Sequence, residues 1–297
     1  MRSIFRNILG LVVLTILWVN TLFWCTPLII VSIFKFILPI PEWTKNINKL
    51  LIFFGQSWIS VNSWLVENIS GVQIDTNAFD NLNYQSSYMV VANHQSYADI
   101  IILQKIFNHR IPFLKFFLKK QLFWVPFLGL AWWALDFPFM QRHSKEYLKK
   151  HPEEAGKDLI ATKKACEKFK TMPVAVMNFT EGTRFRVEKK AKQHSPYVNL
   201  LKPKAGGLGY VLTILDEQIE KVVDVSISYS GKTPGIIGFL GGKLKNIPVK
   251  VRVLDIPQPV KNNYIENKAC RVATQQWLNV IWQEKDLWLQ QHLKTNL

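Results

Sequence analysis

The feature that most limits how this chain can fold is an almost unbroken apolar run near its N-terminus, from Ile8 to Ile40. Ile8 to Cys25 is about long enough to cross a bilayer as a helix, whereas Leu28 to Ile40 is too short to cross alone. We therefore expect one of two arrangements: a single long tilted span, or a helical hairpin that bends at Pro27 and enters the membrane without leaving its far side.

The flanks of this run bear on topology. No small-x-small site follows it, which argues against a cleaved signal peptide. Basic residues lie on both sides: Arg2, Arg6, Lys35, Lys45 and Lys49. They suit a hairpin with both ends in the cytoplasm. We predict that residues 1–42 are embedded in a membrane, the inner membrane if the protein is bacterial, with any active site facing the cytoplasm.

Residues 43–70 continue with apolar side chains at three- and four-residue steps, and they include Trp43, Trp58 and Trp64. This spacing predicts an amphipathic helix. It is either a helix that packs on a core or, given the tryptophans beside a membrane segment, one that lies at the interface.

Beyond residue 71, short apolar runs typical of strands alternate with helical periodicities. The runs lie within 71–92, 136–140, 173–179, 222–229 and 249–254, and the helical patterns begin near Ile100 and cover 153–170 and 264–293. We predict one α/β domain over residues 71–297, with a mixed central sheet flanked by helices and a C-terminal helix. Residues 111–140, dense in aromatic side chains, are either core or an apolar lip that admits a lipid chain.

One strand ends in an abruptly polar turn. Tyr88 to Ala92 is apolar, Asn93-His94-Gln95-Ser96 follows, and a helix begins after it with Ser96 as a plausible N-cap. If Asp99 lies in the first helical turn, its carboxylate can fold back onto His94. That contact would set the imidazole tautomer and leave the other ring nitrogen free to take a proton. The alternative is an ordinary surface turn.

Two further predicted strands also end in polar residues. The run at 136–140 is followed by Arg142, and the run at 173–179 by the turn Thr180-Glu181-Gly182-Thr183-Arg184. If these strands are neighbours in one sheet, the three turns meet at one edge and form a single site.

The net charge of the chain indicates what kind of molecule it binds. Lys and Arg outnumber Asp and Glu by 37 to 21, giving a net charge of +16. This surplus fits nucleic acid, anionic lipid or a phosphorylated small molecule. The basic segment 185–204 is either a solvated, mobile loop or a site for anionic headgroups. Aromatic residues sit in apolar runs and not between lysines, so we do not expect a nucleic-acid partner.

Other kinds of site lack their signatures. His and acidic residues lack metal-ligand spacing, and Gly206-Gly207-Leu208-Gly209 lacks the spacing of a nucleotide-binding loop. Cys25, Cys166 and Cys270 form no pairable framework, which indicates a reducing compartment. We expect neither a metal nor a cofactor.

Two motifs together resemble the glycerolipid acyltransferase family. They are Asn93-His94-Gln95-Ser96-Tyr97-Ala98-Asp99 and Phe179-Thr180-Glu181-Gly182-Thr183-Arg184, about 85 residues apart. The chain is most similar to the 1-acylglycerol-3-phosphate O-acyltransferases, also called lysophosphatidic acid acyltransferases. Phe139-Met140-Gln141-Arg142 resembles the family's intermediate motif, and the resemblance covers roughly residues 85–230.

The resemblance implies acyl transfer from an acyl thioester, acyl-CoA or acyl-carrier protein, to a lysophospholipid hydroxyl. His94 would be the general base and Asp99 its orienting partner. Backbone N–H groups near Gly182 would bind the oxyanion. Arg184, Arg142, Thr183 and Lys120 would bind the acceptor phosphate, and Glu181 would hold Arg184 or a backbone amide in place. The list of implied substrate-binding residues is Glu181, Gly182, Thr183, Arg184, Arg142 and Lys120.

One departure bears on the acceptor. The family's fourth block usually has a proline in a Val- and Ile-rich strand, and this chain has Asp224 there. That variant, with Leu201-Lys202-Pro203-Lys204, is similar to the lysocardiolipin acyltransferase-like subgroup. The alternatives are therefore an enzyme for another lysolipid, or a membrane-tethered protein that binds RNA or anionic lipid without chemistry.

Overall fold

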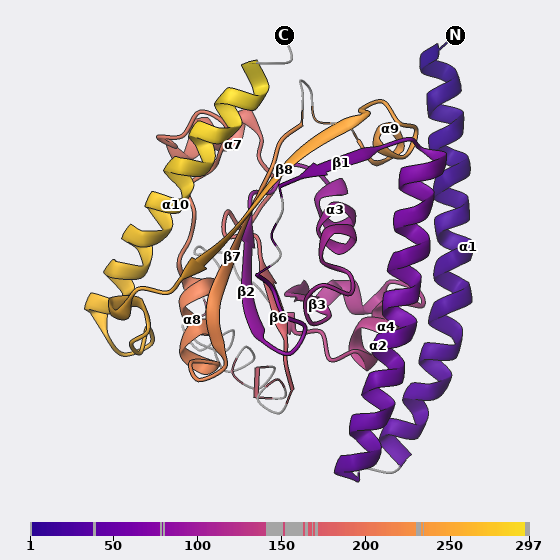
Figure 1. Cartoon of the computed structure of the whole chain (residues 1–297), viewed down its shortest axis with the longest axis horizontal. Helices are drawn as coiled ribbons and strands as arrows, with labels where there is room; N and C mark the ends of the chain where they lie inside the picture. The colour runs from indigo at the N-terminus through magenta and orange to yellow at the C-terminus, as the bar shows by residue number, and fades with distance from the viewer. Residues whose placement is uncertain are drawn as a thin grey trace.

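A mixed sheet of six strands forms the centre of the molecule, in the order β1-β8-β7-β2-β6-β3 (Figure 1). The computed structural model describes residues 2–37, 40–77, 79, 81–140, 151, 163, 166–167, 169, 172–229, 233 and 235–294. The strands are β1 (Gln73–Thr76), β2 (Ser87–Ala92), β3 (Leu114–Phe116), β6 (Ala175–Asn178), β7 (Ile219–Ile227) and β8 (Asn246–Asp255). All neighbours run parallel except β7 and β8. The predicted class, an α/β fold with a mixed sheet, is confirmed.

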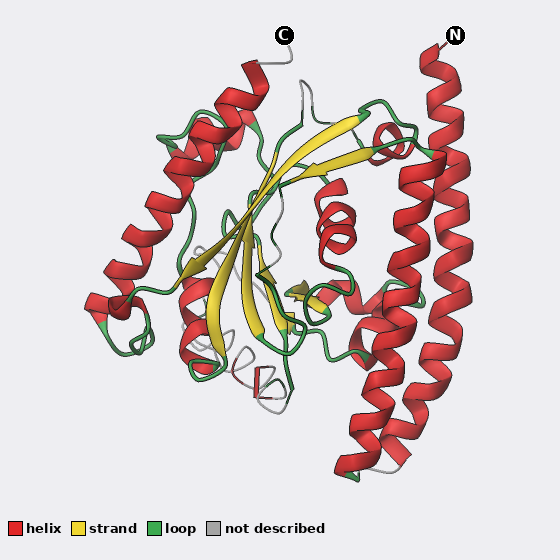
Figure 2. Cartoon of the chain, viewed as in Figure 1, coloured by secondary structure: helices red, strands yellow, loops and turns green. Residues whose placement is uncertain are grey.

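Helices cover both faces of the sheet (Figure 2). The helices are α1 (Arg2–Ile37), α2 (Pro41–Trp64), α3 (Ala98–Phe107), α4 (Leu128–Ala134), α7 (Val187–Gln193), α8 (Gly206–Ile214), α9 (Ile236–Leu240) and α10 (Lys268–Lys294), with shorter turns η1 (Leu65–Ile69), η2 (Lys120–Trp124) and η4 (Gln258–Val260). The residues of β2 alternate between two cores. Val90 packs on the α1–α4 side, and Val91 packs on the side of α8 and α10. This double burial explains why β2 is an unbroken apolar run.

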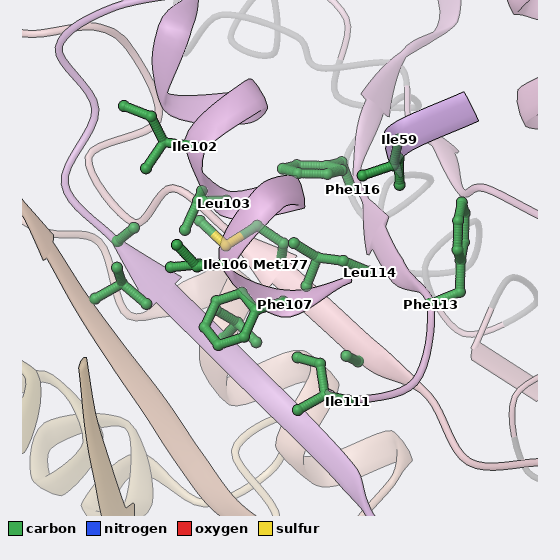
Figure 3. Close-up of a cluster of buried hydrophobic side chains, with 14 of the residues drawn as sticks. Ile59, Ile102, Leu103, Ile106, Phe107, Ile111, Phe113, Leu114, Phe116 and Met177 are labelled. Carbon is green, nitrogen blue, oxygen red and sulfur yellow. The ribbon is translucent and has the colours of Figure 1, made fainter. Parts of the chain in front are cut away.

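The first core lies between α3 and the sheet (Figure 3). Ile102, Leu103 and Ile106 of α3 are buried against Leu114 of β3 and Met177 of β6 (Figure 3). This packing holds the start of α3, which carries Asp99, against the carboxyl end of the sheet.

The predicted third strand of the site does not join the central sheet. The strand described there, β5 (Phe139–Met140), pairs in parallel with β4 (Leu118–Lys119) in a separate two-stranded sheet. That part of the prediction is wrong, because the backbone of Phe139–Met140 pairs with Leu118–Lys119 and not with a strand of the central sheet. Arg142 and most of the predicted helix 153–170 lie outside the described residues.

The N-terminal run forms one continuous helix. α1 passes through Pro27 without a break, so of the two expected arrangements the hairpin bent at Pro27 is not formed. The chain reverses after Ile37, and α2 runs back along α1 (Figure 1). Cys25 and Leu28, on either side of Pro27, are both buried. Packing along the helix holds it together where the proline removes one hydrogen bond.

Polar groups of α1 find partners elsewhere in the fold. Asn20 donates to Asn62 Oδ1 at 2.8 Å, and Lys35 Nζ lies 2.6 Å from Asp136 Oδ2 and donates to Ala134 O at 3.1 Å. α1 is thus tied to α2 and to the end of α4.

The outward face of α1 stays apolar. Ser3–Ile37 is the one helix of the described chain that is long and apolar enough to cross a membrane, by length and composition alone, and 28% of its most apolar stretch is buried. Exposed side chains on it include Phe5, Ile8, Leu11, Val19, Phe23, Ile30, Ile33 and Ile37. Residues 111–140 divide: Phe113, Phe116 and Phe137 are core, whereas Trp124 and Trp133 are exposed.

Asp224, the departure in the apolar strand, has a structural explanation. It lies on the face of β7 that meets α10, where its carboxylate is 2.7 Å from Lys285 Nζ and 2.7 Å from an Arg252 nitrogen. Asp224 and Lys285 are both fully buried. A buried pair of this kind is strongly destabilised when one partner is removed, so it links α10 to the sheet.

Candidate active site

Asn93 fixes the turn that follows β2. Its side-chain amide donates to Ile227 O and accepts from Ile227 N, each at 2.9 Å. Asn93 is fully buried. This two-point clamp joins the carboxyl end of β2 to that of β7, so the next residue, His94, emerges at a defined edge of the sheet.

The structure places His94 and Asp99 in contact. His94 Nδ1 lies 2.8 Å from Asp99 Oδ2, which also accepts the backbone N–H groups of Gln95 at 2.7 Å and Ser96 at 2.9 Å. Because a carboxylate only accepts, the neutral form of His94 in this contact carries its proton on Nδ1 and its lone pair on Nε2. The Asp99 side chain is 1% exposed and that of His94 is 16% exposed, so the imidazole is accessible to solvent while the carboxylate is buried.

An aromatic ring packs flat on the imidazole. The Phe179 ring, which follows β6, stacks on His94 with centroids 3.9 Å apart and an interplanar angle of 15°. This contact restricts rotation of His94 about its side-chain bonds. The sequence shows Phe179 only as the first residue of the second motif.

The second turn lies directly beside the first. Buried Glu181 accepts the His94 N–H on Oε1 and the Leu201 N–H on Oε2, each at 3.4 Å, and Phe185 N donates to His94 O at 2.7 Å. β2 and β6 are neighbours in the sheet, and these bonds join their two polar turns. Burial raises the pKa of Glu181 to about 8, an effect offset in part by the two N–H groups and by the charge of Lys285.

Gly182 and Arg184 determine the backbone path and the charge of this second turn. Gly182 has a φ of +71°, which favours glycine, and its N–H donates to Phe179 O at 2.8 Å. The Arg184 guanidinium lies 3.6 Å from the centroid of the Tyr97 ring. Thr183 Oγ1 accepts a hydrogen bond from Lys189. A cation is therefore held over the start of α3, close to the His94 turn.

Of the two remaining predicted phosphate ligands, the structure describes Lys120 and does not describe Arg142. Lys120 lies exposed at the start of η2, after β4. Arg142 is outside the described residues, and its role stays a prediction.

Two residues of the site go beyond the sequence prediction: Lys204, which the sequence places only within the basic segment 185–204, and Tyr229, which it does not single out. A Cβ built on Gly182 would lie 3.6 Å from Lys204 Nζ, so this ammonium group reaches over the turn. Tyr229 donates a hydrogen bond to Asp99 Oδ1. The available signal for Tyr229 is its position just after β7, at a third strand end.

This arrangement of a sheet edge, an oriented imidazole and a cationic glycine turn suits an enzyme that deprotonates the hydroxyl of an anionic substrate. The family model described as Acyltransferase matches residues 67–230, more than half of the chain. The chain therefore belongs to the acyltransferase family, as the sequence resemblance indicated.

The relatives that the chain matches are named for different acceptor lysophospholipids. The chain is 27% identical over 258 residues to a 2-acyl-1-lysophosphatidylinositol acyltransferase of Saccharomyces cerevisiae, covering 71% of this chain and 62% of the relative. It is 24% identical over 224 residues to 1-acyl-sn-glycerol-3-phosphate acyltransferase delta of Mus musculus, covering 70% of this chain and 54% of the relative. The chain thus spans less than two thirds of the length of either.

A solved structure shares the fold. The 1-acyl-sn-glycerophosphate (LPA) acyltransferase PlsC from Thermotoga maritima superposes with a TM-score of 0.56 at 20% identity, covering 96% of this chain and 98% of that one.

Proposed function

We propose that this protein moves a fatty acyl group from an acyl thioester to the free hydroxyl of a lysophospholipid. The observation that carries the proposal is the His94–Asp99 pair, in which Nδ1 of His94 faces the carboxylate, beside the turn that ends in Arg184. The simplest acceptor is 1-acylglycerol-3-phosphate, which would give phosphatidic acid.

In the proposed reaction His94 Nε2 takes the proton of the acceptor hydroxyl while that oxygen attacks the thioester carbonyl carbon. The new C–O bond produces a tetrahedral oxyanion. When it collapses, the C–S bond breaks and the imidazolium returns its proton to the leaving thiolate. Asp99 stabilises the imidazolium throughout. The ester and a free thiol are the products, and the enzyme is regenerated without a covalent intermediate.

The oxyanion needs hydrogen-bond donors. The N–H of Gly182 is already committed to Phe179 O. The proposed donors near Gly182 are therefore the next N–H groups of the turn, those of Thr183 and Arg184.

The acceptor phosphate would be held by cations at the same turn. Arg184 offers a planar fork whose orientation is set by Tyr97, and Lys204 adds a point charge above Gly182. Arg142 and Lys120 remain predicted phosphate ligands. Glu181 would act indirectly, by holding the backbone of His94 and Leu201.

The second candidate acceptor is a lysophospholipid whose phosphate carries a further group, such as a lysophosphatidylinositol or a lysocardiolipin. The Saccharomyces cerevisiae relative, named for lysophosphatidylinositol, favours it. The donor would be acyl-CoA or an acyl-carrier protein. Both are acidic and suit a chain with a net charge of +16.

A membrane is the proposed location, with the site facing the cytoplasm. The apolar outer face of α1 continues onto α4, where Trp133 stacks on Phe36 with centroids 4.4 Å apart. Lipid substrates could then reach the site from the bilayer surface. A single tilted span and a shallow helical pair are both compatible with α1 and α2.

The test is an assay of purified protein with labelled acyl-CoA, or acyl-carrier protein, and a panel of lysolipids. We expect one acceptor to dominate, and product formation to fall by at least about 10³-fold in His94→Gln. Arg184→Gln should raise the acceptor KM more than the donor KM. Wild-type protein that forms no product with any pair would favour the binding-protein alternative, and a fully active His94→Gln would remove His94 as the base.

A further inference from the structure

The Asp99 carboxylate accepts hydrogen bonds on both oxygens, and the two oxygens face different parts of the chain. Oδ2 accepts from residues of its own turn: His94 Nδ1, and the N–H groups of Gln95 and Ser96. Oδ1 accepts from the hydroxyl of Tyr229, which is 130 residues further along the chain. The half of the carboxylate that faces away from His94 is thus held by a separate element.

The fold determines where Tyr229 lies. β7 pairs in parallel with β2, with Val225 opposite Ala92, and the Asn93 clamp holds Ile227 at the end of both strands. Tyr229 lies two residues after Ile227 and is 1% exposed. Burial and the nearby charge of Asp99 raise the pKa of Tyr229 well above its usual value, so its hydroxyl remains a donor at neutral pH.

Other ionisable groups near Asp99 come from different elements. Glu181, after β6, accepts the N–H of His94 and interacts with the charge of Asp99. Lys285 of α10 interacts in turn with Glu181. Arg184 lies over Tyr97 in the turn before α3. Removing only the Tyr229 hydroxyl leaves all of these groups in place.

We propose that Tyr229 is a positioning residue that acts through Asp99 on His94. The Tyr229 hydroxyl holds the Asp99 carboxylate in the plane in which Oδ2 contacts His94 Nδ1. Its hydrogen bond also partly neutralises the carboxylate charge, which otherwise favours the protonated form of His94. This inference rests on the proposed acyl transfer for its role in catalysis. Its effect on His94 can be measured without any substrate.

The test compares Tyr229→Phe with Tyr88→Phe. Tyr88 is also buried, and its hydroxyl accepts the Asn83 N–H at 2.7 Å, so the control loses a buried hydroxyl on β2 away from Asp99. The first measurement is the pH dependence of His94 modification by diethyl pyrocarbonate, which reacts with the unprotonated imidazole, located by peptide mass spectrometry. We expect Tyr229→Phe to move this curve to higher pH by about half a unit. Tyr88→Phe should not move it.

The second measurement is steady-state acyl transfer. Tyr229→Phe should lower kcat about tenfold with both KM values within about twofold, and shift the acidic limb of the rate profile in the same direction as the modification curve. A modification curve that coincides with that of the wild type would overturn the inference. So would a lower kcat with an unmoved acidic limb, because packing alone would then explain it.

Replacing Tyr229 with 3-fluorotyrosine keeps the ring and strengthens the donor, so the modification curve should move to lower pH. This variant decides the question if Tyr229→Phe fails to fold, and a curve that does not move would overturn the inference. If the wild type transfers no acyl group, the proposed function fails, while the modification curves still judge the role of Tyr229.

Discussion

Glu181 should make the stability of this protein depend on pH in a direction opposite to that of an ordinary ion-paired carboxylate. Burial raises its pKa from 4.5 to about 8. Between these two values the folded state holds a proton that the unfolded state has released. The contribution to stability is therefore complete below pH 4.5 and is lost as the pH rises through 8.

The size of the effect follows from the same two values. One proton of difference changes the free energy of unfolding by about 1.4 kcal/mol per pH unit. The window from 4.5 to about 8 therefore sets a ceiling of about 5 kcal/mol. For a chain of 297 residues, Tm should change by about 2 °C per pH unit within the window.

The perturbation is Glu181→Gln, which keeps the length of the side chain and removes its titration. The assay is thermal unfolding, followed by tryptophan fluorescence in detergent, from about pH 5 to 9 for both proteins. We expect the Tm of wild type minus that of Glu181→Gln to fall steadily to about pH 8 and then flatten. A changed hydrogen bond to His94 or Leu201 would add an offset but no slope.

A matched control is Glu188→Gln, an exposed carboxylate in the first turn of α7, which should leave the slope unchanged. If the curves of wild type and Glu181→Gln run parallel across the window, the reasoning from burial is refuted.

Further predictions concern the core and the phosphate turn. Asp224→Asn should lower the free energy of unfolding by about 3–5 kcal/mol, because Lys285 stays buried without its anion. Replacing Asp224 by Leu and Lys285 by Met together should recover most of the lost Tm. A double variant no more stable than Asp224→Asn would contradict this. Gly182→Ala should lower the free energy of unfolding, measured by thermal unfolding, by about 1 kcal/mol because of the φ of +71°. No steric clash adds to this, since the nearest atom to the new Cβ, Lys204 Nζ, would be 3.6 Å away. Lys204→Met should raise the acceptor KM several-fold while its neighbour variant Lys202→Met does not, and equal effects would argue against a phosphate ligand above Gly182.

The strands that carry the two motifs can be predicted because each is marked locally. Ser87–Ala92 and Ala175–Asn178 are short apolar runs that end in polar turns, and parallel pairing brings such ends to one edge. Strand order is not encoded in this way. The Tyr229 contact depends on β7 lying beside β2, and no periodicity in the sequence reports that neighbour.

Other differences between sequence and structure have local causes. The segment 185–204 contains the helix α7, although its lysines suggest a solvated, mobile loop as one interpretation. Pro27 suggests a bend because the missing N–H of proline can be read directly from the sequence. The packing that keeps α1 continuous comes from α2 and α4, and the sequence around Pro27 does not show it. Asp224 is visibly unusual in its strand, but its partners on β8 and α10 cannot be predicted from β7 alone.

The ties that hold α1 have a consequence for biosynthesis. α1 is synthesised before the domain that follows it, yet Lys35 is paired with a residue made 101 positions later. Asn20 must likewise wait for Asn62, which follows 42 residues behind it. During synthesis the apolar helix α1 therefore exists for a time with the Lys35 ammonium group unpaired near its C-terminal end. The helix can reach its final packed position only after the chain has been extended past Asp136.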